Sequence, residues 1–195
     1  MLTLSFMRHA FVASTFIAIV SGFVGVFVVA RNLSFLTHTL SEIGFAGGAF
    51  AVFIGWPVLN GMILFTMLSS ILVGQMSIKE SRHEAVTSAV SALFIGLGIL
   101  FLSLSSANAS SATNILFGSV VGINLTEVWQ LIYLSIVVIL IIFAVYRQLK
   151  FTSFDAIGAR VSGLNAALYS VIFLIVLALS VSVAAQIVGS LLIFI

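Results

Sequence analysis

"HAFVASTFIAIVSGFVGVFVVARN", residues 9–32, is a long run of apolar side chains that ends at a single basic residue, Arg31. A helix of about 20 apolar residues is long enough to cross the hydrocarbon core of a bilayer, and this run has that length. Similar runs recur along the 195-residue chain, which is 62% hydrophobic and has a mean hydropathy of +1.36. A soluble domain of this size would need a far larger polar surface. The sequence therefore predicts an integral membrane protein.

The membrane-spanning segments are expected to be α-helices. The chain has one proline, Pro57, and lacks the series of short alternating segments that builds a transmembrane β-barrel. We therefore expect an all-α, polytopic helical bundle in which residues 1–195 form a single transmembrane domain. Six transmembrane helices are predicted, at residues 9–30, 33–55, 58–76, 85–105, 126–146 and 164–187.

The basic residues indicate how this bundle is oriented in the membrane. Three alternate breaks between the predicted helices contain all but one of the cations, namely Arg31, Lys79, Arg82, Arg147, Lys150 and Arg160. The breaks at 56–57 and 105–124 carry none, and only Arg8 lies on their side of the membrane. By the positive-inside rule, the basic breaks face the cytoplasm. The N-terminus is then predicted to be external.

The composition gives no support to several classes of function. The chain has no cysteine, which excludes thiolate metal ligands and cysteine nucleophiles. Its net charge is only +2 and its basic residues are scattered, so no nucleic-acid partner is expected. The P-loop pattern G-x-x-x-x-G-K-[ST] does not occur, so this chain is not predicted to bind ATP through such a loop.

The second predicted helix carries a polar stripe within "NLSFLTHTLSEIGFAGG", residues 32–48. A helix turns 100° and rises about 1.5 Å per residue, so His38 and Glu42 lie about 40° apart and one turn apart. The same side is predicted to carry three hydroxyl residues, Ser34, Thr37 and Ser41. Such a stripe should face protein or water rather than lipid.

Glu42 is the one acidic residue predicted to lie deep in the membrane, roughly 13 Å into a hydrocarbon core about 30 Å thick. The other acids stand at helix ends or in breaks: Glu80, Glu84, Glu127 and Asp155. Burial of a carboxylate costs several kcal/mol unless the group is paired, protonated or metal-bound. An imidazole and a carboxylate four residues apart can share one Zn²⁺, Mn²⁺ or Fe²⁺ ion. A structural hydrogen bond between His38 and Glu42, or to a neighbouring helix, explains the pair equally well.

Four segments, taken in order, resemble one known family. They are "FMRHAFVASTFIAIVSGFVGVFVVARNLSFLTHTLSEIGFAGGAFA" (6–51), "ATNILFGSVVGINLTEV" (112–128), "SFDAIGARVSGL" (153–164) and "QIVGSLLIFI" (186–195). Together they resemble the permease subunits of bacterial metal ABC importers, which import manganese, zinc or iron(II). The resemblance implies a type II ABC importer-like permease in the bacterial plasma membrane. Members of the family usually continue for several more helices, so the family's C-terminal helices are expected to be missing from this chain.

The resemblance also implies roles for individual residues. The family normally carries an Asp and a His, four residues apart, in a metal-handling segment where this chain has His38 and Glu42. It places a coupling helix for the ATPase in a cytoplasmic loop that corresponds to residues 151–164. The matching coupling residues are Phe154, Asp155, Ala159, Arg160 and Gly163. The alternative for this segment is an ordinary basic loop that only sets the topology.

The leading hypothesis is a permease subunit, not an enzyme, of an ABC importer for manganese, zinc or iron. The expected partners are a cytoplasmic ATPase subunit, an extracellular metal-binding protein, a second permease copy that makes a homodimer, and membrane lipid. No cofactor is expected to be bound permanently, because the metal would be the transported substrate.

Two alternatives stay open beside this hypothesis. An intramembrane metalloenzyme would need a third ligand and a base. His9 and His83 lie near opposite ends of their predicted helices, and no H-E-x-x-H pattern occurs. A permease for an organic metal chelate would be favoured by a wide, aromatic-lined cavity.

Overall fold

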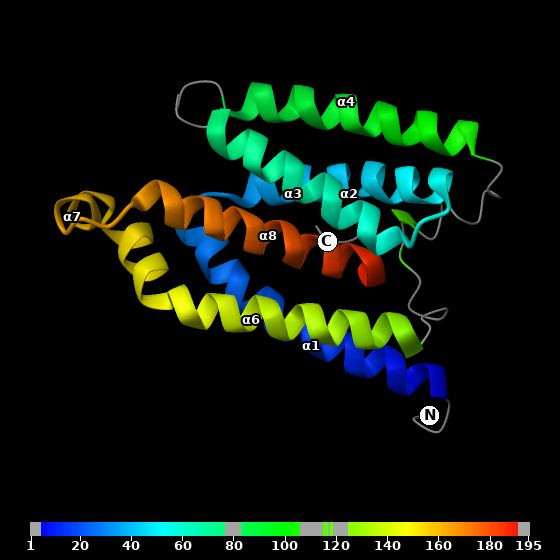
Figure 1. Cartoon of the computed structure of the whole chain (residues 1–195), viewed down its shortest axis with the longest axis horizontal. Helices are drawn as coiled ribbons and strands as arrows, with labels where there is room; N and C mark the ends of the chain where they lie inside the picture. Colours follow the sequence, from blue (N-terminus) through cyan, green and yellow to red (C-terminus); the bar gives the residue numbers. More distant parts are fainter. Residues whose placement is uncertain (1–4, 77–82, 106–114, 117, 119–124, 191–195) are drawn as a thin grey trace.

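A computed structural model describes residues 5–76, 83–105, 115–116, 118 and 125–190, and its regular elements there are all helices (Figure 1). The helices are α1 (Ser5–Ala30), α2 (Ser34–Ile54), α3 (Val58–Met76), α4 (His83–Leu104), α6 (Leu125–Phe154), α7 (Ala156–Val161) and α8 (Ala166–Val188). Each predicted transmembrane segment corresponds to one of the six long helices. The predicted all-α bundle is therefore confirmed.

Helix length and composition fit a membrane protein. Four helices of the described chain are long and apolar enough to span a bilayer, at Met7–Ala30, Thr87–Leu104, Leu125–Phe154 and Ala166–Val188. α3 contains a shorter apolar stretch, Val58–Leu72. α2 has a spanning length of 21 residues and carries the ionisable side chains of His38 and Glu42. Because polar groups are costly in lipid, α2 has to turn these two side chains toward protein or water.

The long helices run back and forth along one axis (Figure 1). At one end lie α7 and the junction between α1 and α2, together with the C-terminal end of α3 and the N-terminal end of α4. At the other end lie the N-terminus and the junction between α2 and α3. The helix ends that flank the three basic breaks are therefore together, as the alternation of cations predicted. That this end faces the cytoplasm stays a prediction.

α8 is the central helix and joins two groups of helices. It contacts α1 and α6 on one side and α2 and α3 on the other, while α4 packs on α2 (Figure 1). The side of α8 toward α1 and α6 is filled by apolar side chains, among them Val24, Phe27, Val138, Ile142, Leu149, Phe173 and Leu177. This half of the bundle is built mainly on an apolar core.

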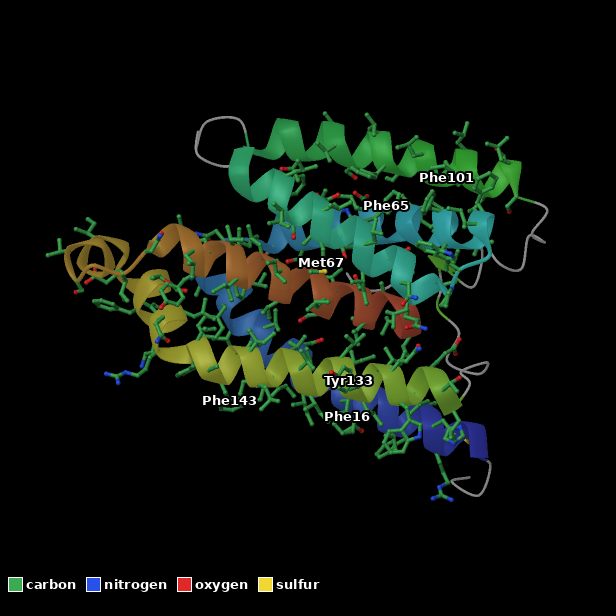
Figure 2. All side chains as sticks on the ribbon, viewed as in Figure 1. Phe16, Phe65, Met67, Phe101, Tyr133 and Phe143 are labelled. Carbon is green, nitrogen blue, oxygen red and sulfur yellow. The ribbon has the colours of Figure 1, made fainter. Side chains whose placement is uncertain are left out.

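Glycine residues bring α2 and α3 into backbone contact. A Cβ atom at Gly47 would collide with the carbonyl oxygen of Gly61, and one at Gly61 would collide with the carbonyl oxygen of Gly47. Small residues commonly allow helices in membranes to approach this closely. Beside the crossing, the ring of Phe50 lies 5.3 Å from that of Phe65 on α3 and 5.2 Å from that of Phe101 on α4, measured between centroids (Figure 2).

The end of α6 differs from the prediction. A break was expected to begin at residue 147, but the helix continues to Phe154. Leu149 is fully buried in the apolar core, which holds this extra length of helix against the bundle. Asp155 then starts α7, because its carboxylate accepts a hydrogen bond from the backbone N–H of Gly158 at 2.7 Å. The segment 151–164 is therefore a helix end, a short helix and a turn rather than an open loop.

Candidate functional site

The hydroxyl residues of the predicted stripe on α2 have different surroundings. Ser34 is exposed at the start of the helix. The hydroxyl of Thr37 donates to the backbone carbonyl of Leu33 at 3.0 Å and so is satisfied within the helix. Ser41 is fully buried and donates to the backbone carbonyl of Ser190, beyond the end of α8, at 2.6 Å. These bonds leave His38 and Glu42 as the polar pair of α2 that can act together.

The side chains of His38 and Glu42 meet on α2 as the period predicted. Nε2 of His38 lies 3.5 Å from Oε1 of Glu42, farther than the 2.7–3.2 Å of an ordinary hydrogen bond. Two ligands that share a tetrahedral ion at about 2.0–2.2 Å are themselves about 3.4 Å apart. The observed spacing is compatible with two ligands of one ion and equally with an i,i+4 ion pair. The side chain of His38 is 45% exposed and that of Glu42 is 24% exposed, so both can be reached from outside this chain.

Ser91 on α4 holds the second oxygen of Glu42. Its hydroxyl donates a hydrogen bond to Oε2, while Oε1 is the oxygen nearer to His38. The Ser91 side chain is buried, which fixes the carboxylate plane against α4. This residue was not predicted from the sequence. The available signal was a group of three hydroxyl residues, Thr87, Ser88 and Ser91, before a long apolar stretch of the same helix.

Further hydroxyl groups line the contact between α3 and α8 in the same half of the bundle. Thr66 and Ser182 are both buried, and their hydroxyl oxygens are 2.8 Å apart in a hydrogen bond that joins the two helices. The methyl group of Thr66 lies 3.6 Å from the position that a Cβ on Gly44 would occupy, so this contact adjoins α2. Buried hydroxyls of α3 and α8 therefore lie next to α2 at Gly44, two residues after Glu42.

A complete metal site is not formed by the described residues of one chain. Among them, no group of three His, Cys, Asp or Glu side chains could hold an ion. His9 belongs to α1 near the N-terminal end of the bundle, and His83 begins α4 at the opposite end (Figure 1). Both stand on helices other than α2, and the side chain of His83 lies outside the described part of the structure. Among the described residues, His38 and Glu42 are therefore the two side chains that could share an ion.

The five predicted coupling residues lie in or beside α7, in different surroundings. Phe154 is 71% exposed, whereas Ala159 is fully buried. Asp155 begins α7 through its bond to Gly158. Gly163 has a φ of +77° and ends the helix, where the backbone N–H of Leu164 donates to the carbonyl of Ala159 at 3.1 Å. Arg160 belongs to α7, and its side chain lies outside the described part of the structure.

α7 also has exposed apolar side chains that were not predicted from the sequence. Ile157 and Val161 are 79% and 84% exposed, and their four-residue separation places them on one face of the short helix. With Phe154 they make an exposed apolar surface at the end of the bundle. The signal was present as the spacing of apolar residues in "FDAIGARV", residues 154–161. A surface of this kind suits docking against another protein.

Comparison with known proteins identifies the family. The model of the ABC 3 transport family matches residues 3–195. This chain belongs to the ABC 3 transport family. The match extends over almost the whole sequence and confirms the resemblance to ABC permeases seen in the four segments.

Relatives of known description agree with this assignment. The manganese import system permease protein ScaB of Streptococcus gordonii is 30% identical over 192 residues, which cover 96% of this chain and 68% of ScaB. A membrane protein of Cyanophora paradoxa from the ycf23-apcF intergenic region, described as uncharacterized, is 32% identical over 193 residues. That match covers 97% of this chain and 64% of the relative.

A solved structure shows the same fold. PsaBC from Streptococcus pneumoniae in complex with Fab matches with a TM-score of 0.86 at 25% identity, over 97% of this chain and 69% of that chain. The chain thus spans 64–69% of the length of these proteins. Those of known role are permeases of transport systems and not enzymes.

Proposed function

We propose that this chain forms part of the permease of an ABC importer that moves a divalent transition metal into the cytoplasm. The observation that carries the proposal is the His38–Glu42 pair, whose nitrogen and oxygen are 3.5 Å apart on a helix packed inside a membrane bundle. Mn²⁺ is the first candidate, because ScaB is described as a permease of manganese import. Zn²⁺ and Fe²⁺ accept the same nitrogen and oxygen donors and remain within the proposal.

The pair is suited to hold an ion transiently. Ser91 takes one oxygen of Glu42, so the other oxygen and the His38 imidazole supply two donors to the ion. Two donors alone bind weakly, and a transport site has to release its ion as well as bind it. A second permease copy with the same pair would supply four donors, and the 45% exposure of His38 allows such an approach. We therefore include a homodimer in the proposal.

The other proposed partners are the separate subunits of an ABC importer. A separate ATPase would bind ATP and dock on α7, whose exposed Phe154, Ile157 and Val161 offer an apolar contact surface. An extracellular metal-binding protein would deliver the ion at the end of the bundle that holds the N-terminus. The metalloenzyme alternative has less support, because no third protein ligand joins the pair among the described residues.

The proposal is tested by metal uptake. The complete transporter, with its ATPase and binding protein, is expressed in cells that lack other importers for these metals. Uptake of labelled Mn²⁺ is then measured alone and in competition with Zn²⁺ and Fe²⁺. His38→Ala and Glu42→Ala should each lower uptake by more than about 100-fold, which exceeds the usual effect of losing an outer-shell partner. Thr37→Ala is the matched control on the same helix, because its hydroxyl bonds only to its own backbone.

Two results would contradict the proposal. Unchanged uptake in the variant with both His38→Ala and Glu42→Ala would show that these residues do not bind the transported metal. Uptake that requires an added organic chelator, with no transport of the bare ions, would favour the permease for a metal chelate.

A further inference from the structure

Arg31 occupies the short junction between α1 and α2. Its backbone N–H still donates to Phe27 at 3.0 Å, but the next residue, Asn32, has a φ of +54° and turns the chain. The backbone N–H of Leu33 then donates to Val28 at 2.9 Å, and α2 begins at the following residue. Movement of this junction would therefore be passed directly to the start of α2.

The side chain of Arg31 reaches across the bundle to the end of α6. Its Nε donates to the hydroxyl of Ser153 and its Nη2 to the hydroxyl of Thr152, both at 2.8 Å. Nη1 donates to the hydroxyl of Ser170 on α8 at 3.4 Å, and the guanidinium carbon lies 5.0 Å from the centre of the Phe173 ring. One side chain thus connects the α1–α2 junction with two other helices.

The chemistry of this contact suits a joint between helices. Each described hydrogen-bond acceptor of Arg31 is a neutral hydroxyl rather than a carboxylate. The hydroxyls of Thr152 and Ser153 bond in turn to the carbonyls of Gln148 and Leu149, at 2.9 and 2.6 Å. The positive guanidinium therefore sits at the carboxyl end of α6, where the helix dipole favours a cation. Burial lowers the pKa of Arg31, but an arginine side chain stays charged.

Setting the topology does not require such a contact. A cation that only obeys the positive-inside rule can extend into solvent, as the exposed side chains of Arg147 and Lys150 do at the same end of the bundle. Arg31 is instead partly buried and directed inward. Ser153 stands two residues before Asp155, the residue that begins α7. α7 itself packs on α6 and α8 rather than on α2.

We infer that Arg31 is a positioning residue that transmits displacement of α7 to α2, through Thr152 and Ser153 on one side and the α1–α2 junction on the other. The inference rests on the proposed function, because it assigns to Arg31 the mechanical link between ATPase docking and the His38–Glu42 pair. The guanidinium joins the element that meets the ATPase to the helix that carries the metal ligands. Because its acceptors are neutral hydroxyls, the Arg31 side chain can move without leaving a buried carboxylate unpaired.

Two readouts on the reconstituted transporter, with its ATPase, test this inference. The first is the amount of Mn²⁺ transported per ATP hydrolysed in vesicles. The second is movement of α2, reported by a thiol reagent on Ser34→Cys; the chain has no native cysteine, and Ser34 is exposed at the start of α2. Arg31→Gln should keep ATP hydrolysis within about twofold and lower transport per ATP by about tenfold or more, the scale of a lost charge-assisted hydrogen bond. The ATP-dependent change in labelling should disappear.

Controls separate this role from stability and from the proposed function. Arg147→Gln removes a cation at the same end and should leave both readouts unchanged. Thr152→Val with Ser153→Ala removes two of the three acceptors and should give the same loss of transport per ATP. This double variant tests the inference even where Arg31→Gln fails to fold. Unchanged transport per ATP in Arg31→Gln, or an equal fall in transport and ATP hydrolysis, would overturn the inference. If the wild type moves α2 with ATP but carries no metal, the proposed function fails while the labelling readout still decides the role of Arg31.

Discussion

Arg31 and the His38–Glu42 pair both bring charge to the interior of an apolar bundle, and the structure holds them in opposite ways. The guanidinium of Arg31 has hydrogen bonds to three hydroxyls and an aromatic ring beneath it. The His38 nitrogen and the Glu42 oxygen are 3.5 Å apart, wider than a hydrogen bond, and both side chains are partly exposed. A set of contacts between three helices suits a joint, whereas a nitrogen and an oxygen with access from outside suit an ion that binds and is released.

The largest effect is expected from a substitution in α7 that abolishes docking of the ATPase. Ile157→Asp places a carboxylate in the apolar surface that we expect the ATPase to contact, so the ATPase should no longer co-purify with the permease. Loss of a central apolar contact can lower affinity by about 2 kcal/mol or more, and a desolvated charge adds to this. Mn²⁺ binding by the permease should be unchanged. Ile157→Val is the control, and retention of the ATPase by Ile157→Asp would show that α7 is not the docking element.

Thermal stability should distinguish the joint from the ligand pair. Arg31→Gln removes charge-assisted hydrogen bonds, so the free energy of unfolding should fall by about 1–3 kcal/mol and the Tm by several degrees. Glu42→Gln keeps an acceptor for Ser91 and removes a carboxylate from a partly exposed position in an apolar bundle, so its Tm should be equal to or above that of the wild type. Thermal unfolding of the purified complex in detergent measures both. A larger loss of stability in Glu42→Gln than in Arg31→Gln would reverse the comparison.

The smallest of the expected effects is at Ser91. Ser91→Ala removes the hydrogen bond that orients the Glu42 carboxylate, and loss of such an outer-shell partner typically costs about 10–100-fold in metal affinity. We expect the lower end of that range, seen as a higher KM for Mn²⁺ uptake with a nearly unchanged maximal rate. Ser91→Thr keeps the hydroxyl and should restore most of the affinity. An unchanged KM in Ser91→Ala would mean that α4 does not position the carboxylate.

Much of the fold could be predicted because one physical effect dominates it. Apolar runs long enough to span a bilayer must be helices, since backbone groups cannot be left unpaired in lipid. The end of α6 could not be placed in this way. Residues 147–154 are mixed in polarity, and only the burial of Leu149 against other helices shows that they continue the helix.

The candidate site could be predicted only where it depends on a single helix. The 3.6-residue period places His38 and Glu42 together without knowledge of any neighbour. Ser91 contributes from α4, and its part in the site depends on how α2 and α4 pack. The role of Arg31 was hidden for another reason. The positive-inside rule accounts for a cation at that position equally well, and only its contacts across the bundle set it apart from Arg147.

The central claim, that His38 and Glu42 bind the transported metal, is tested most directly by pulsed electron paramagnetic resonance of bound Mn²⁺. The complete transporter is purified without a histidine tag and loaded with Mn²⁺ in the absence of nucleotide. The wild type should show coupling between the manganese electron spin and an imidazole nitrogen. That coupling should vanish in His38→Ala but persist in the Thr37→Ala control, and Glu42→Gln should bind Mn²⁺ more weakly. A nitrogen coupling that persists in His38→Ala, or Mn²⁺ affinity that is unchanged in Glu42→Gln, would contradict the account.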